Sequence, residues 1–268
     1  MSPSSCRTSP KESSLTRCWR CPPGNAAIRV CWRRFQRSRC ADRGKGAGAQ
    51  RTPISSTICF VNHLDTIYAL YPDAYVIHII RDGRAVAASR QGKKIKVAQI
   101  KGAEPPAYPA FETPSGEQVS FQLLNYAADW HGYIQIARHQ SAQANSARYL
   151  EIGYERLLAE PRAVLEQICA FIEAPFVEGM LRYYEQPEEQ IPDPYFRANH
   201  RNITKPPDPA IARRWREKLS PAVIHALQQA IGPALKQGGY DLVEVEVSAA
   251  DRRAIDQNVA AWRRERAW

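Results

Sequence analysis

Beyond residue 57 the chain alternates between two kinds of hydrophobic pattern. Apolar residues recur at helical spacing over residues 60–71, 121–139, 157–172 and 220–239. Residues 75–80 form a β-branched run typical of a buried strand, and residues 149–155 are expected to form a second strand. This alternation predicts an α/β fold in which helices flank a parallel sheet. A further helix is expected to begin near Ala85, directly after the first strand.

The remaining stretches give weaker patterns. Residues 102–118 are rich in Pro, Gly and Glu and predict a loop. Residues 210–219 predict a basic helix, and residues 251–268 a basic amphipathic helix with Ile255, Val259 and Trp262 on one face. No apolar run approaches the roughly 20 residues that span a bilayer, and no secretory signal is recognisable. We therefore expect a cytoplasmic protein.

Residues 1–57 do not share this organisation. They mix Ser, Arg, Cys, Trp and Pro without helical or strand periodicity. Two interpretations stay open: a disordered basic leader, or a frameshifted segment read from GC-rich DNA in the wrong phase. We therefore divide the chain into an atypical leader at 1–57, an α/β domain at 58–241 and a C-terminal helical tail at 242–268.

The net charge of +10 is concentrated in that leader. Residues 1–57 hold 12 Lys and Arg residues against Glu12 and Asp42 alone. Subtracting them from totals of 37 basic and 27 acidic residues leaves 25 of each in the body of the chain. A neutral body does not predict nucleic-acid binding, so a nucleic-acid-binding protein that uses the basic leader is retained only as an alternative.

The leader also holds most of the cysteines, among them Cys18 and Cys21 at the two-residue spacing of zinc and redox sites. A zinc site would need a second such pair or a pair of histidines, and residues 1–57 contain no histidine. A redox motif would need a helix after Cys21, where Pro22-Pro23-Gly24 breaks the chain instead. We predict no metal site.

The first candidate for chemistry is Arg81-Asp-Gly-Arg84, which follows the buried strand, with Ser89 further along the next helix. Ligands of α/β sheets gather beyond the carboxyl ends of the strands. The start of the following helix offers free N–H groups and a positive dipole end. The Arg81 fork can bind two phosphate oxygens, and Ser89 can add a hydroxyl. The competing interpretation is that Arg81 pairs with a local carboxylate such as Asp82 and that Ser89 is an incidental small residue of the helix.

This helix–strand–Arg-Asp-Gly-Arg–helix pattern resembles the 3'-phosphate-binding segment of sulfotransferases, near the tyrosylprotein and carbohydrate branch. The resemblance implies a P-loop-NTPase-like sulfotransferase fold and the donor 3'-phosphoadenosine 5'-phosphosulfate. It places Arg81 and Ser89 on the donor's 3'-phosphate, and Lys93 as a further contacting cation. A solvated basic face remains the alternative for Lys93.

Two later stretches extend the resemblance. The stretch YLEIGYERLLAEPRAVLEQICAFI, from residue 149, resembles the family's second signature and places Tyr154 at the cofactor, with Glu155 structural. The stretch RNITKPPDPAIARRWREKLSP, from residue 201, resembles a C-terminal clamp. Its matching residues are Asn202, Thr204, Lys205 and Arg214. The prolines would keep the clamp stiff and lower the entropy lost when it closes. A plain surface charge is the alternative for Arg214.

The resemblance covers residues 60–241 and omits the family's first strand and Gly-rich 5'-phosphosulfate loop. Gly44-Lys-Gly-Ala-Gly48 lacks both a preceding strand and a following Ser or Thr, and is rejected as that loop. The catalytic base therefore stays unknown.

We expect a sulfotransferase that acts on a hydroxyl acceptor, which could be a protein tyrosine, a carbohydrate or a small molecule. A non-catalytic fragment of such an enzyme is the alternative.

Overall fold

The computed structural model describes residues 58–100, 102–104, 107–185 and 204–266. Nearly all of them fall within one compact unit, Cys59–Trp268. The leader predicted at 1–57 lies outside the described residues, so its interpretation and the proposed domain boundaries stay predictions. Within the described residues, no helix is both long enough and apolar enough to cross a bilayer.

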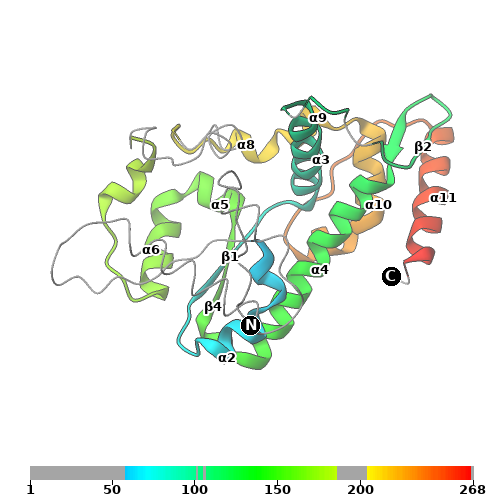
Figure 1. Cartoon of the computed structure of the whole chain (residues 1–268). Coiled ribbons are helices and arrows are strands. Elements are labelled where there is room, and N and C mark those ends of the chain that lie inside the picture. The colour runs from blue at the N-terminus through cyan, green and yellow to red at the C-terminus, as the bar shows by residue number, and fades with distance from the viewer. Residues whose placement is uncertain (1–57, 101, 105–106, 186–203, 267–268) are drawn as a thin grey trace, which may run out of the picture. The chain divides into compact units, whose positions relative to one another are not determined.

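A pair of parallel strands lies at the centre of the unit, β1 (Val76–Ile80) and β4 (Tyr149–Gly153) (Figure 1). Their register runs from Val76 opposite Tyr149 to Ile80 opposite Gly153, so both strands end at the same edge. This confirms the predicted α/β fold with a parallel sheet. Each strand is shorter than predicted: β1 begins one residue after Tyr75, and β4 ends before Tyr154, which begins a helix.

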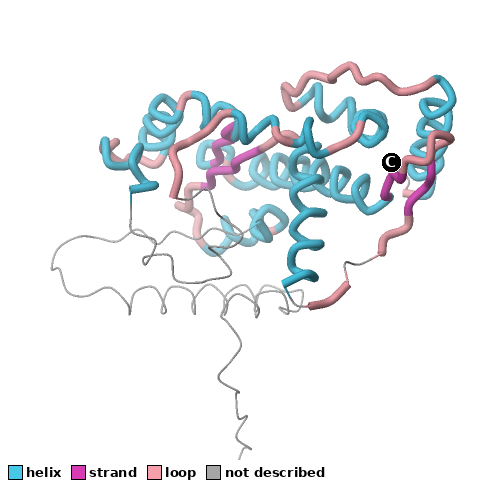
Figure 2. Tube along the Cα trace, turned by 90° about the horizontal axis from the view of Figure 1, so that it is seen from above, coloured by secondary structure: helices cyan, strands magenta, loops and turns pink. Residues whose placement is uncertain are grey.

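The long helix α4 (Phe121–Ala144) packs against three other α-helices of the unit. It contacts α2 (Leu64–Leu70), α3 (Gly83–Ile100) and α10 (Pro221–Gln237) (Figures 1 and 2). The 3-10 helix η2 (Ile58–Asn62) precedes α2, so the predicted helix over 60–71 is divided in two. The helix after β1 begins at Gly83, two residues earlier than expected.

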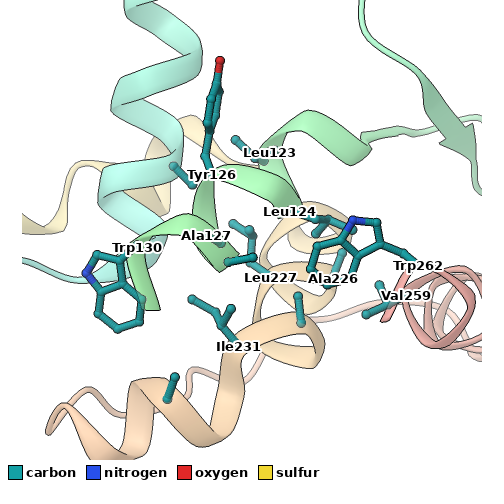
Figure 3. Packing of buried hydrophobic residues seen from close by; sticks show 14 of the residues in the cluster. Leu123, Leu124, Tyr126, Ala127, Trp130, Ala226, Leu227, Ile231, Val259 and Trp262 are labelled. Atoms are coloured by element: carbon teal, nitrogen blue, oxygen red, sulfur yellow. The ribbon is translucent and has the colours of Figure 1, made fainter. Parts of the chain in front are cut away.

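The main core lies between α4, α10 and the last helix, α11 (Ala249–Glu265) (Figure 3). Leu124, Leu227 and Ile231 are buried there with at most 2% of their surface exposed. Ile255, Val259 and Trp262 of α11 join the same cluster, on the single face that their spacing predicted. The indole N–H of Trp262 donates to Asn125 Oδ1 at 2.9 Å, so its one polar atom is satisfied.

The loop predicted over 102–118 is wrong in its second half, where a small antiparallel hairpin forms. Strands β2 (Ala110–Glu112) and β3 (Gln118–Ser120) pair there, with Phe111 opposite Val119. Gly116 turns the chain at a φ of 87°, a conformation that favours glycine. Three-residue strands are too short for an alternating pattern to be visible in the sequence.

Two further predicted helices are divided in the structure. The segment after β4 forms α5 (Tyr154–Ala159) and α6 (Pro161–Phe171), separated at Glu160. Pro161 disfavours helical backbone at the residue before it and suits the first position of a new helix. The predicted helix over 210–219 is likewise divided into α8 (Ala210–Arg213) and α9 (Trp215–Lys218). The short 3-10 helices η3 (Ser146–Arg148) and η4 (Glu178–Glu185) complete the described elements.

One face of the sheet carries a half-buried polar network. His78 Nδ1 lies 2.6 Å from the Tyr149 hydroxyl, which donates to Glu151 Oε1 at 2.9 Å. Arg138 of α4 donates two bonds of 2.8 Å to the Glu151 carboxylate. Burial lowers the pKa of the His78 imidazole. At Glu151 burial acts to raise the pKa, but the hydrogen bonds from Arg138 and Tyr149 outweigh it and hold the pKa low.

These two pKa shifts predict that the free energy of unfolding decreases as the pH is lowered. Each group has a folded pKa below its ordinary value, 6.5 for His78 and 4.5 for Glu151, so the unfolded chain binds more protons. Each contribution is complete above the ordinary value and is lost as pH falls below it. A His78→Gln variant should therefore show a smaller drop in Tm than the parent protein between about pH 7.5 and pH 5.5. His139→Gln, an exposed change on α4, is the control. Parallel Tm curves for His78→Gln and the parent would remove His78 from this account.

Candidate functional site

The turn between β1 and α3 is held by the side chain and backbone of Asp82. Its carboxylate Oδ1 accepts the backbone N–H of Arg84 at 2.9 Å, which caps the start of α3. Its own backbone N–H donates to Glu155 Oε1 at 3.1 Å. Because Glu155 belongs to α5, directly after β4, this bond ties the ends of the two parallel strands together. Glu155 thus has a structural contact, as the sequence led us to expect: it accepts the backbone N–H of Asp82.

Arg84 is the most deeply buried charged side chain of the turn, with 2% of its surface exposed. Its guanidinium donates to both carboxylate oxygens of Asp82 at 2.8–3.3 Å. It also donates to Gln228 Oε1 at 2.8 Å and to the carbonyl oxygen of Asp241 at 2.9 Å. The ring of Trp215 lies 4.3 Å below it. The alternative in which Arg81 pairs with Asp82 is therefore wrong, because Arg84 takes that carboxylate.

Because Arg84 occupies the Asp82 carboxylate, Arg81 does not pair with it. Its guanidinium lies 4.7 Å from the ring centroid of Tyr154 and donates to the carbonyl oxygen of Ile211 at 3.0 Å. Its Nε–H is buried and finds no acceptor within the described residues. Among the described residues, no carboxylate forms an ion pair with Arg81. A half-buried arginine without a counter-charge, at the end of a parallel strand, is suited to bind an anion.

The other predicted residues lie on three segments around this turn. Ser89 and Lys93 are exposed on α3, four residues apart and so on one face of the helix. Thr204 and Lys205 are exposed, and the carbonyl oxygen of Lys205 accepts from the hydroxyl of Tyr183. Arg214 pairs with Asp208 at 3.4 Å and keeps about half of its surface exposed. Asn202 lies outside the described residues.

The short helices α8 and α9 connect these segments. Helix α8 contacts α5, which begins at Tyr154, and α9 contacts α3, which carries Ser89 and Lys93 (Figure 1). The exposed side chains of this stretch are mostly basic and include Arg213, Arg216 and Lys218. The clamp-like segment therefore lies beside both strand-end motifs, as a cover over an anion site would.

Tyr240 is a supporting residue that the sequence pattern did not reveal. Its hydroxyl donates to Glu155 Oε2 at 3.3 Å, and its ring meets Trp130 edge-on at 6.2 Å. Burial, followed by the negative charges of Glu155 and Asp82, raises the pKa of Tyr240, so the phenol stays protonated. It lies just beyond the helix-ending Gly238-Gly239, where the sequence offered a helix cap and no functional signal.

Comparison with known proteins identifies similar chains. A model described as "Sulfotransferase family" matches residues 37–178. A "Putative protein-tyrosine sulfotransferase" of Caenorhabditis elegans is 31% identical over 124 residues, which are 46% of this chain and 40% of that protein. Its namesake in Caenorhabditis briggsae is 28% identical over 182 residues, 66% of this chain and 56% of that protein. The chain thus spans about half the length of these relatives.

Two solved structures share the fold. One is the "Sulfotransferase Domain from the Synechococcus PCC 7002 Olefin Synthase", with a TM-score of 0.52, 24% identity, and coverage of 72% of this chain and 60% of that one. The other is the "Sulfotransferase Domain from the Curacin Biosynthetic Pathway", with a TM-score of 0.53, 18% identity, and coverage of 73% and 65%. At these identities the likeness establishes the fold alone.

Gly83 tests how tightly the turn is packed. A Cβ at this position would lie 2.7 Å from Trp130 Cε3 and 2.9 Å from Ile231 Cδ1. Both atoms belong to the core, so Gly83→Ala should lower the free energy of unfolding by about 1–3 kcal/mol. The same change at Gly92 of α3 meets nothing within 4 Å and should raise it by about 0.5–1 kcal/mol. Urea unfolding measures both. Equal effects would show that Trp130 does not restrict the turn.

Proposed function

The chain belongs to the sulfotransferase family, and we propose that it binds 3'-phosphoadenosine 5'-phosphosulfate and transfers the sulfuryl group to a hydroxyl acceptor. The observation that carries the proposal is Arg81, a half-buried arginine over Tyr154 with no carboxylate partner within the described residues. A doubly charged phosphate would supply the counter-charge that Arg81 lacks among the described residues.

The residues around the turn suit the 3'-phosphate end of the donor. Arg81 would bind two phosphate oxygens with its planar fork, and the exposed Ser89 and Lys93 would add a hydroxyl and a cation. Tyr154 would support the guanidinium from below. The segment containing Asn202, Thr204, Lys205 and Arg214 would cover the nucleotide, since α8 and α9 lie beside both motifs.

In the proposed reaction the sulfur–oxygen bond to the donor's phosphate breaks and a sulfur–oxygen bond to the acceptor forms. The acceptor hydroxyl loses its proton, and adenosine 3',5'-bisphosphate leaves with the electron pair of the broken bond. The described residues stabilise the negative charge of the donor and leaving nucleotide through Arg81 and the basic residues of α8 and α9. We assign none of them as the base that takes the proton.

The names of the relatives favour one acceptor class. Two of them are named protein-tyrosine sulfotransferases, so the phenolic hydroxyl of a protein tyrosine is the first acceptor to test. Carbohydrate and small-molecule hydroxyls follow from the same chemistry. The charge distribution does not favour nucleic acid, since the excess of basic residues lies in residues 1–57.

Substitution of Arg81 tests nucleotide binding. Calorimetric titration with adenosine 3',5'-bisphosphate should give a dissociation constant about tenfold or more weaker for Arg81→Ala than for the parent chain. Arg81→Lys should fall between them, because lysine keeps the charge and loses the fork. The matched control is Arg156→Ala, an exposed arginine of α5 that pairs only with nearby surface groups. An unchanged dissociation constant in Arg81→Ala would refute the site.

A transfer assay separates binding from catalysis. The full chain is incubated with the donor labelled in its sulfuryl group and with a tyrosine-containing peptide. Label in the peptide that disappears with Arg81→Ala supports the whole proposal. Nucleotide binding without any transfer would leave the binding site standing and support the alternative of a non-catalytic fragment.

A further inference from the structure

A cavity of about 130 Å³ lies between α4, the end of α10 and the ends of β1 and β4. Its apolar lining includes Ile80, Trp130, Ile134, Ile152 and Ala234. Its polar lining includes His131, Gln135, Arg138, Glu151 and Gln237. An apolar interior with a few convergent polar groups is the usual composition of a small-molecule site.

The volume limits the ligand to a single ring. A dry protein cavity of about 150 Å³ is known to hold one benzene molecule. The present cavity is of similar size and is open to solvent on one side. A six-membered ring would therefore fill the apolar part and leave one substituent at the polar mouth.

The charges of the lining cancel. Arg138 is the cation of the lining, and its two bonds of 2.8 Å to Glu151 neutralise the anion. Burial, together with the charge of Arg138, lowers the pKa of His131, so its imidazole is neutral near pH 7. A charged ligand would lose its hydration without gaining an opposite charge, whereas an uncharged ligand has no such cost.

The side-chain amides of Gln135 and Gln237 offer both hydrogen-bond donors and acceptors to a ligand in the cavity. At the mouth, the Gln135 amide lies 3.1 Å from His131 Nε2 and 3.5 Å from Gln237 Oε1. These side-chain amides can both donate to and accept from a ligand.

We propose that this cavity binds an uncharged single-ring compound with an adjacent acceptor and donor, of the aromatic carboxamide class. The ring lies against Ile134, Ala234 and Trp130, and the carboxamide pairs with the amides of the mouth. The cavity adjoins the proposed donor site through Ile80, Gly153 and Tyr240, but Arg81, Ser89 and Tyr154 do not line it. A carboxamide ring also has no hydroxyl to accept a sulfuryl group, so the proposal does not rest on the transfer reaction.

Benzamide and benzoate form a matched pair of probes, because they share size and shape and differ in charge. Saturation-transfer NMR on the full chain, without nucleotide, should show saturable benzamide binding and benzoate binding at least tenfold weaker. Ala234→Leu, which fills the cavity, should weaken benzamide binding at least tenfold. Ile136→Ala is the control, since Ile136 is 39% exposed on α4 and does not line the cavity.

A second variant covers the case in which Ala234→Leu does not fold. Gln135→Ala changes an exposed side chain of the mouth and should weaken benzamide binding about threefold or more while leaving Tm near that of the parent. The proposal is overturned if the parent shows no saturable benzamide signal, if benzoate binds as well as benzamide, or if folded Ala234→Leu and Gln135→Ala both bind like the parent.

Discussion

The buried ion pair between Asp82 and Arg84 is the constraint on which the candidate site depends. Removing two charges from water is costly, and their attraction compensates only when the remaining donors and acceptors are also satisfied. Here they are satisfied from distant parts of the chain: by Gln228 of α10 and by the carbonyl oxygen of Asp241. The geometry of the turn after β1 therefore depends on residues of the C-terminal third that pack beside it.

The same constraint explains why Arg81 is available to a ligand. Since Arg84 occupies both oxygens of Asp82, the neighbouring arginine has no local counter-ion. It is instead placed by Tyr154, from the adjacent strand end, and by the carbonyl of Ile211. Glu155 fixes the distance between the two strand ends by accepting from Asp82 and from Tyr240. Four segments far apart in sequence thus position one guanidinium.

The sequence was sufficient for the features that local patterns encode. The sequence pattern predicted both strands, β1 from its β-branched run, and the helical spacing of Ile255, Val259 and Trp262 predicted the buried face of α11. It was insufficient where long-range contacts decide. Nothing local distinguishes Arg81 from Arg84 as the partner of Asp82, because the choice depends on Gln228 and Asp241. The supporting role of Tyr240 was missed for the same reason.

The carbonyl of Ile211 raises the question of whether the cover and a phosphate compete for Arg81. A guanidinium carries five N–H donors, and the Ile211 carbonyl uses one of them, on a terminal nitrogen. The buried Nε–H has no acceptor among the described residues, and a bidentate phosphate needs only two donors. Both partners can therefore bind together. Because the cover reaches Arg81 through a backbone carbonyl of α8, its contact does not depend on a particular side chain. A phosphate would then add to the contact that holds α8 in place, so nucleotide binding and closure of the cover should reinforce each other.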